Sequence, residues 1–139
     1  MTGEQPQQHQ YLKDCFSRGT IPVQARAIRA LGELKDDTVR ELCEAIVMED
    51  WDAVRRLGLT LAATPGPEDL NRLRNAALEA LRDVGNPSSI ETLRIARQQP
   101  SMSITFRQLT FDVAEDIYWR VTGGLSKETF DPQEKAASR

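Results

Sequence analysis

The chain has 139 residues, of which 40% are apolar, 28% charged and 6% aromatic, and its formal net charge is -3. This length predicts a single domain, and the ordinary glycine and proline contents exclude fibrous and wholly disordered proteins. The only histidine, His9, and two isolated cysteines, Cys15 and Cys43, exclude metal sites of the common His/Cys kinds. We expect no metal and no other cofactor.

The start of the chain and its apolar stretches bear on location. Residues 1–10 lack the apolar segment of a secretory signal, and charges interrupt every apolar stretch short of the ~18–20 residues of a membrane span. We therefore expect a cytoplasmic protein with no membrane contact. Cys43 falls among apolar neighbours and is interpreted as a buried residue rather than a reactive thiol.

Apolar residues recur at helical spacing along the chain, and no sustained alternation predicts a strand. We therefore predict an all-α protein. Five helices are expected over residues 8–18, 22–34, 39–49, 51–63 and 68–84. A sixth follows Ser88 or Ser89 and ends before Pro100. A seventh begins at Ser101 or Ser103 and ends at Thr122.

Proline, glycine and polar side chains set the expected ends of these helices. Pro22 opens the second helix, because the missing N–H of a proline costs nothing in the first turn. Prolines around Gly66 end the fourth helix. Gly85 is expected to end the fifth in the left-handed conformation. Ser88 and Glu91 have the spacing of a capping box for the sixth helix.

The two ends of the chain are more polar than its centre. Residues 124–139 are rich in Ser, Lys, Glu, Asp and Gln, and residues 1–7 are polar throughout. We expect a disordered N-terminus at 1–7, a helical repeat domain at 8–123 and a flexible C-terminal tail at 124–139.

The helical region contains an internal repeat of about 50 residues. Three pairs of segments match, the last after a slip of one residue: 30–34 with 80–84, 59–61 with 109–111, and 39–45 with 90–96. Because the three matches occur in the same order, duplication explains them better than chance does.

Residues 26–37 and 75–87, with the apolar positions that follow each, resemble HEAT repeats of the short kind first noted in phycobilisome lyases. The resemblance covers about residues 8–122. It implies antiparallel helical pairs, in which alanines allow close approach, leucines fill the layer and a Gly/Asn/Pro turn reverses the chain. We expect a short HEAT-like α-solenoid of about seven helices, or a compact α-bundle built from the same pairs.

Catalytic machinery is hard to find in this sequence. There is no glycine-rich phosphate loop, and Ser-His-Asp catalysis would depend on His9 in the polar N-terminus. Three acid pairs are interpreted as helix caps or solvated surface: Asp36 with Asp37, Asp50 with Asp52, and Glu115 with Asp116. We expect a non-catalytic protein.

The last expected helix carries apolar residues on more than one side. One stripe consists of Phe106, Leu109, Val113, Ile117 and Val121. A second stripe, with intervals of seven residues, consists of Ile104, Phe111 and Tyr118. A terminal solenoid helix normally presents a polar outer face, so this helix is either sandwiched within the domain or binds a partner. The protein-binding candidates are Ile104, Phe111, Tyr118 and Trp119, together with Trp51 at an earlier helix start.

Arginines form a second candidate surface, for phosphate groups. If the helices stack in order, seven of them would align along one edge, as in HEAT-like DNA glycosylases with a basic groove: Arg55, Arg56, Arg72, Arg74, Arg94, Arg97 and Arg107. Several have an acidic residue nearby, so ordinary surface pairing is the competing interpretation.

The leading hypothesis is a non-catalytic HEAT-like module or scaffold that binds another protein or domain. The alternative is a binder of nucleic acid or a phosphate ligand through the arginines, although the chain lacks a strongly basic field. A phycobilin-lyase-like or maturation-factor subunit is a third reading, which depends on fold resemblance alone. The identity of the partner and the oligomeric state stay open.

Overall fold

The computed structural model describes residues 4–61, 64–100 and 102–123. All regular elements in these ranges are helices, which confirms the predicted all-α class. Their bounds are α1 Glu4–Arg18, α2 Ile21–Glu33, α3 Thr38–Val47, α4 Trp51–Arg56, α5 Pro67–Val84, α6 Pro87–Arg97 and α7 Ile104–Thr122.

The N-terminal boundary differs from the prediction. Helix α1 begins at Glu4 rather than Gln8, so residues 4–7, expected to belong to a disordered N-terminus, are helical. The predicted flexible tail at 124–139 lies outside the described residues.

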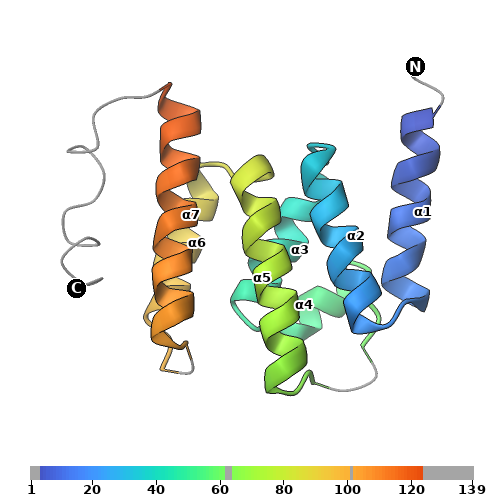
Figure 1. Ribbon diagram of the computed structural model, residues 1–139, viewed down its shortest axis with the longest axis horizontal. Coiled ribbons are helices and arrows are strands. Elements are labelled where there is room, and N and C mark those ends of the chain that lie inside the picture. Colours follow the sequence, from blue (N-terminus) through green and yellow to red (C-terminus); the bar gives the residue numbers. More distant parts are fainter. Residues whose placement is uncertain (1–3, 62–63, 101, 124–139) are drawn as a thin grey trace.

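Helices α2, α5 and α7 lie side by side and run in the same direction, while α3 and α6 lie behind them and run the opposite way (Figure 1). Helix α3 packs against both α2 and α5, and α6 packs against α7. Helix α1 packs antiparallel to α2, at the end of the row opposite α7. The chain therefore forms the short HEAT-like stack of antiparallel helical pairs that the sequence predicts.

Glycines allow the front helices to approach closely. A Cβ on Gly32 of α2 would lie 2.7 Å from Cα of Ala80 in α5. A Cβ on Gly85, just after α5, would lie 2.5 Å from Cδ1 of Ile117 in α7. The φ of Gly85 is −62°, so the predicted left-handed helix end is wrong at this position. Gly85 is needed for close packing, since interiors have no room for overlapping atoms.

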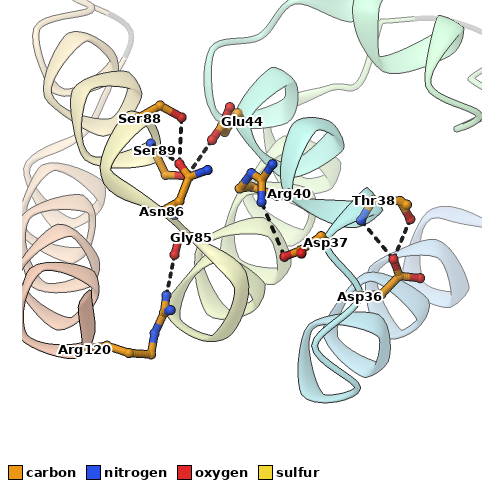
Figure 2. A network of polar contacts seen from close by, with 10 residues as sticks. All are labelled: Asp36, Asp37, Thr38, Arg40, Glu44, Gly85, Asn86, Ser88, Ser89 and Arg120. Carbon is orange, nitrogen blue, oxygen red and sulfur yellow. Dashed lines mark hydrogen bonds and ion pairs between the residues drawn. The ribbon is translucent and has the colours of Figure 1, made fainter. Parts of the chain in front are cut away.

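The repeat of about 50 residues recurs in the polar contacts of two turns, shown in Figure 2. After α2, Oδ1 of Asp36 accepts hydrogen bonds from the backbone N (2.9 Å) and Oγ1 (2.6 Å) of Thr38. After α5, Oδ1 of Asn86 accepts from Oγ of Ser88 at 2.6 Å. Both turns thus bond an Asx side chain to a hydroxyl two residues further on. This shared chemistry supports duplication.

The predicted capping box of α6, formed by Ser88 and Glu91, is wrong in its residues. Asn86 is the N-cap, and it forms the box with Ser89: Asn86 Oδ1 accepts from Ser89 N, and Ser89 Oγ accepts from Asn86 N, both at 3.1 Å. Asparagine caps a helix as well as serine does, and Pro87 suits the first helical position.

The turn after α5 also connects four helices (Figure 2). Oγ of Ser89 donates to Oε2 of Glu44 in α3 at 2.5 Å. Arg120 of α7 donates to the carbonyl oxygens of Gly85 at 2.6 Å and Arg82 at 3.1 Å. Because the last carbonyls of a helix lack intrahelical partners, Arg120 satisfies the C-terminal end of α5. These contacts fix α3, α5, α6 and α7 relative to one another.

Helices α2, α3 and α4 are each followed by a residue with positive φ: Lys35 (58°), Glu49 (57°) and Gly58 (112°). After α4, the N–H of Leu59 donates to the carbonyl of Val54 at 3.2 Å, the bond that closes a Schellman motif. The motif limits α4 to Trp51–Arg56, so the predicted helix begins where expected but its continuation over residues 57–61 is wrong, and residues 62 and 63 lie outside the described residues. Gly58 ends the helix because glycine adopts positive φ without steric strain.

Candidate interaction surfaces

Phe111 lies in the core and not on the surface. Its side chain is only 8% exposed, and the guanidinium of Arg97 in α6 lies over its ring, 5.4 Å from the centroid. The expectation that Phe111 offers itself to a partner is therefore corrected. The second apolar stripe of α7 is partly covered because α6 packs against this helix.

Tyr118 and Trp119 are half-buried near the C-terminal end of α7. Their ring centroids lie 6.5 Å apart, with planes at 78°, in the edge-to-face arrangement that aromatic pairs prefer. Tyr118 packs against the core. The indole Nε1 of Trp119 is buried and has no hydrogen-bond partner among the described residues.

Ile104 lies at the start of α7 and is 85% exposed. At about 100° of rotation per residue, positions 104, 118 and 119 project within about 100° of one another around the helix. We call Ile104, Tyr118 and Trp119 the α7 flank. Beyond α7, no other described helix continues the front row (Figure 1).

Trp51 is the first residue of α4 and is half-buried against the core. Its position is fixed by the N-cap Asp50, whose Oδ1 accepts a hydrogen bond from the backbone N of Ala53 at 3.2 Å. Trp51 lies on a different element from the α7 flank, so the structure separates it from the other protein-binding candidates.

Two of the candidate phosphate-binding arginines are buried. Arg74 is 2% exposed and donates to Oε2 of Glu49 at 2.5 Å. Arg97 is 6% exposed, and its Nε donates to the carbonyl of Arg107 at 3.2 Å. Burial, together with the charge of Arg107, lowers the pKa of Arg97. These side chains stabilise the fold and are not accessible to a phosphate.

The other candidate arginines are spread over several helices. Arg107 is half-buried and donates to the carbonyl of Gln99 at 3.4 Å. Three pair with an acid one helical turn away, as the competing interpretation predicts: Arg55 with Asp52 (3.9 Å), Arg72 with Glu68 (3.5 Å) and Arg94 with Glu91 (3.4 Å). Arg56 is exposed on α4. The expected single arginine-lined edge is therefore corrected: these residues come from both layers, and two point inward.

The structure gathers two arginines that the sequence analysis did not single out. Arg26 and Arg29 of α2 lie with Arg72 of α5 around a cleft of about 310 Å³. The signal in the sequence was the three-residue spacing of Arg26 and Arg29, which places them on one side of a helix. Their proximity to Arg72 depends on how α2 packs against α5, so it could not be predicted from spacing alone.

A second cleft, of about 530 Å³, lies between α1, α3 and α4. Phe16 and Leu42 contribute apolar surface, and Lys13 and Arg40 are among its charged residues. The described side chains that line it include no histidine or cysteine, and its one hydroxyl, from Thr38, donates to Asp36. The cleft therefore has apolar and charged walls without a nucleophile and base in the usual arrangement.

The remaining chemical groups are limited. Cys43 is fully buried, and burial raises the pKa of its thiol well above the usual range, which favours the unreactive neutral form. Among the residues that the structure describes, no cluster of three or more His, Cys, Asp or Glu side chains suits a metal ion. None of the described helices has the length and apolar character of a membrane span.

Residues 23–47 match the family model of the PBS lyase HEAT-like repeat. The match covers most of α2, the following turn and α3, which together form one antiparallel pair of the stack. It confirms the HEAT-like resemblance inferred for this segment. No curated protein and no solved structure shows significant similarity to the chain.

Proposed function

We propose that this chain is a non-catalytic interaction module that binds another protein through the α7 flank, formed by Ile104, Tyr118 and Trp119. The observation that carries the proposal is the 85% exposure of Ile104, which projects on the same side of α7 as the half-buried rings of Tyr118 and Trp119. An exposed isoleucine and two partly exposed aromatic rings on one side of a helix suit an interface that is completed by a partner.

The two ends of the stack support this choice of surface. Helix α1 covers α2 at one end, whereas the row of described front helices ends at α7 (Figure 1). Stacked helical repeats need a polar cap at each end, because every helix otherwise leaves apolar surface exposed to water. At the α7 flank, a helix supplied by another protein would act as this cap.

The chemistry of the flank defines the partner further. Asp112 and Glu115 lie between the apolar positions of α7, and the whole chain has a net charge of -3. The partner we propose is an amphipathic helix with an apolar face and basic residues at its edge. Such edge charges favour orientation and association rate more than affinity.

Substitutions on α7 test the proposal after a partner has been captured with the full chain and purified. Ile104→Glu is expected to weaken binding at least about tenfold, because it places a charge in an apolar contact. Trp119→Phe keeps an aromatic ring but reduces the area available for contact, and a smaller loss of about threefold to tenfold is expected. Both variants should keep the melting temperature of the parent.

Tyr11→Glu is the matched control, since Tyr11 is 69% exposed on α1 at the opposite end of the stack. It should bind the partner as the parent does. If Ile104→Glu bound with parental affinity, or if Tyr11→Glu lost the partner equally, the α7 flank would not be the interface.

A further inference from the structure

Three arginine side chains converge on one cleft at the surface of the front layer. Arg26 and Arg29 come from α2 and Arg72 from α5, and Pro22 and Ala25 complete the lining. The described residues that line this cleft of about 310 Å³ include no carboxylate. The cleft is therefore a compact site with three positive charges in its wall.

The packing of α2 against α5 creates this arrangement. The two helices run parallel and begin at the same end of the molecule (Figure 1). The contact between Gly32 and Ala80 lets their backbones approach closely further along. Arg26 lies in the first two turns of α2 and Arg72 in the second turn of α5. Arg26 and Arg72 thus occupy equivalent positions near the start of two parallel helices.

Nearby acids neutralise this charge only in part. Nε of Arg29 donates to Oε2 of Glu79 at 2.5 Å, which leaves its terminal nitrogens for another acceptor. Arg72 pairs with Glu68 at 3.5 Å, but the Glu68 side chain is 85% exposed, and such pairs are weak. Arg26 makes no ion pair with a described carboxylate, and its Nε has only a long contact of 3.5 Å to the carbonyl of Pro22.

We propose that this cleft binds a phosphate monoester or free phosphate, with Arg26 and Arg72 as its main ligands and Arg29 as a third donor. Guanidinium groups match the geometry of phosphate oxygens because they donate two parallel hydrogen bonds. A phosphate dianion carries up to two negative charges and can therefore neutralise Arg26 and Arg72 together. This inference is independent of the proposed protein interface on α7.

The surroundings favour a compact anion over a nucleic-acid strand. A strand requires a continuous series of cations along its backbone. The exposed arginines Arg55 and Arg56 lie on α4, and the residues next to the cleft include Glu68 and Glu79. Arg55 and Arg56 therefore do not lie on the helices that form the cleft, and the chain as a whole has a net charge of -3.

Calorimetric and NMR titration of the full chain test the proposal, with inorganic phosphate and a phosphoserine peptide as separate probes. Binding of either probe supports the site, and the tighter of the two identifies free phosphate or a phosphorylated side chain as the source. Arg26→Ala and Arg72→Ala are each expected to weaken binding at least about tenfold. Arg56→Ala is the matched control, because it removes an exposed arginine outside the cleft, and it should leave binding unchanged.

Three results would overturn the proposal. The first is that neither probe binds at millimolar concentration. The second is that Arg26→Ala and Arg72→Ala bind as the parent does, or that Arg56→Ala weakens binding equally. The third is that a single-stranded oligonucleotide binds more tightly than both probes, with a steep dependence on salt, since that behaviour would indicate a polyanion surface. Circular dichroism of the exposed-residue variants should match the parent.

Discussion

Replacing Glu49 by Gln tests the contact between the end of α3 and the middle of α5. Glu49 has a φ of 57°, a left-handed conformation that costs a residue other than glycine about 1–2 kcal/mol. Its carboxylate accepts a hydrogen bond from Arg74, whose side chain is 3% exposed and whose guanidinium lies 6.0 Å from the centroid of Phe106. Glu49 therefore neutralises the buried charge of Arg74 although its own backbone conformation is strained.

The size of the effect follows from the burial of the two partners. Removing one member of a fully buried ion pair costs about 3–5 kcal/mol, because the other charge remains in the interior. The Glu49 side chain is 26% exposed, so water reaches part of the pair and lowers the penalty. We therefore expect Glu49→Gln to reduce the free energy of unfolding by about 2–3 kcal/mol.

Urea denaturation, followed by circular dichroism, measures this change in unfolding free energy. Glu68→Gln is the matched control, since it makes the same substitution in a pair whose acid is 85% exposed, and a change below about 0.5 kcal/mol is expected. A Glu49→Gln variant within about 0.5 kcal/mol of the parent would refute the reasoning that Arg74 depends on this carboxylate.

Three further predictions concern packing and reactivity. Gly85→Ala should destabilise the protein by about 1–3 kcal/mol in urea denaturation, and combining it with Ile117→Val should recover part of this loss because the clashing Cδ1 is removed; an additive double variant would contradict the contact. Phe111→Ala should lower the free energy of unfolding by about 3 kcal/mol in the same assay, and an unchanged stability would contradict the burial of Phe111. Native protein should react with DTNB at Cys15, which is partly exposed, and react at Cys43 only in denaturant; rapid modification of both thiols in the native state would argue against burial of Cys43.

The sequence predicted the helices whose ends are determined by local chemistry. Helix α5 spans Pro67–Val84 against a predicted 68–84, and α7 ends at Thr122 as predicted. In both, proline or glycine at the boundary acts within one turn. The internal repeat was also detectable, because the same apolar spacing and turn residues occur twice.

The end of α4 was not predictable from periodicity. Leu59 and Leu61 continue the apolar spacing past Gly58, so the pattern indicates a longer helix. In the structure Leu59 is fully buried although it lies in a loop, and the backbone N of Thr60 donates to the carbonyl of Phe16 at 2.9 Å. Burial of a loop against α1 gives the same apolar signal as a helix face.

The predictions of binding residues were wrong where the environment of a side chain depends on residues far away in the sequence. Arg74 is an ordinary helix arginine in the sequence, but in the structure it is buried and donates a hydrogen bond to Glu49, which follows another helix. Phe111 is covered by Arg97 of the preceding helix. The cleft with Arg26 forms across α2 and α5. Such arrangements depend on helix packing, which local spacing does not determine.

Site-specific photo-crosslinking tests the central claim, that the α7 flank binds a protein partner. A photoreactive residue is placed at position 104 in one variant and, as a control, at position 11, where Tyr11 is 69% exposed on the opposite end of the stack. We predict that position 104 crosslinks to one partner, that position 11 does not, and that Trp119→Ala reduces the yield. Equal crosslinking from both positions, or none from position 104 while the partner still co-purifies with the chain, would contradict the claim.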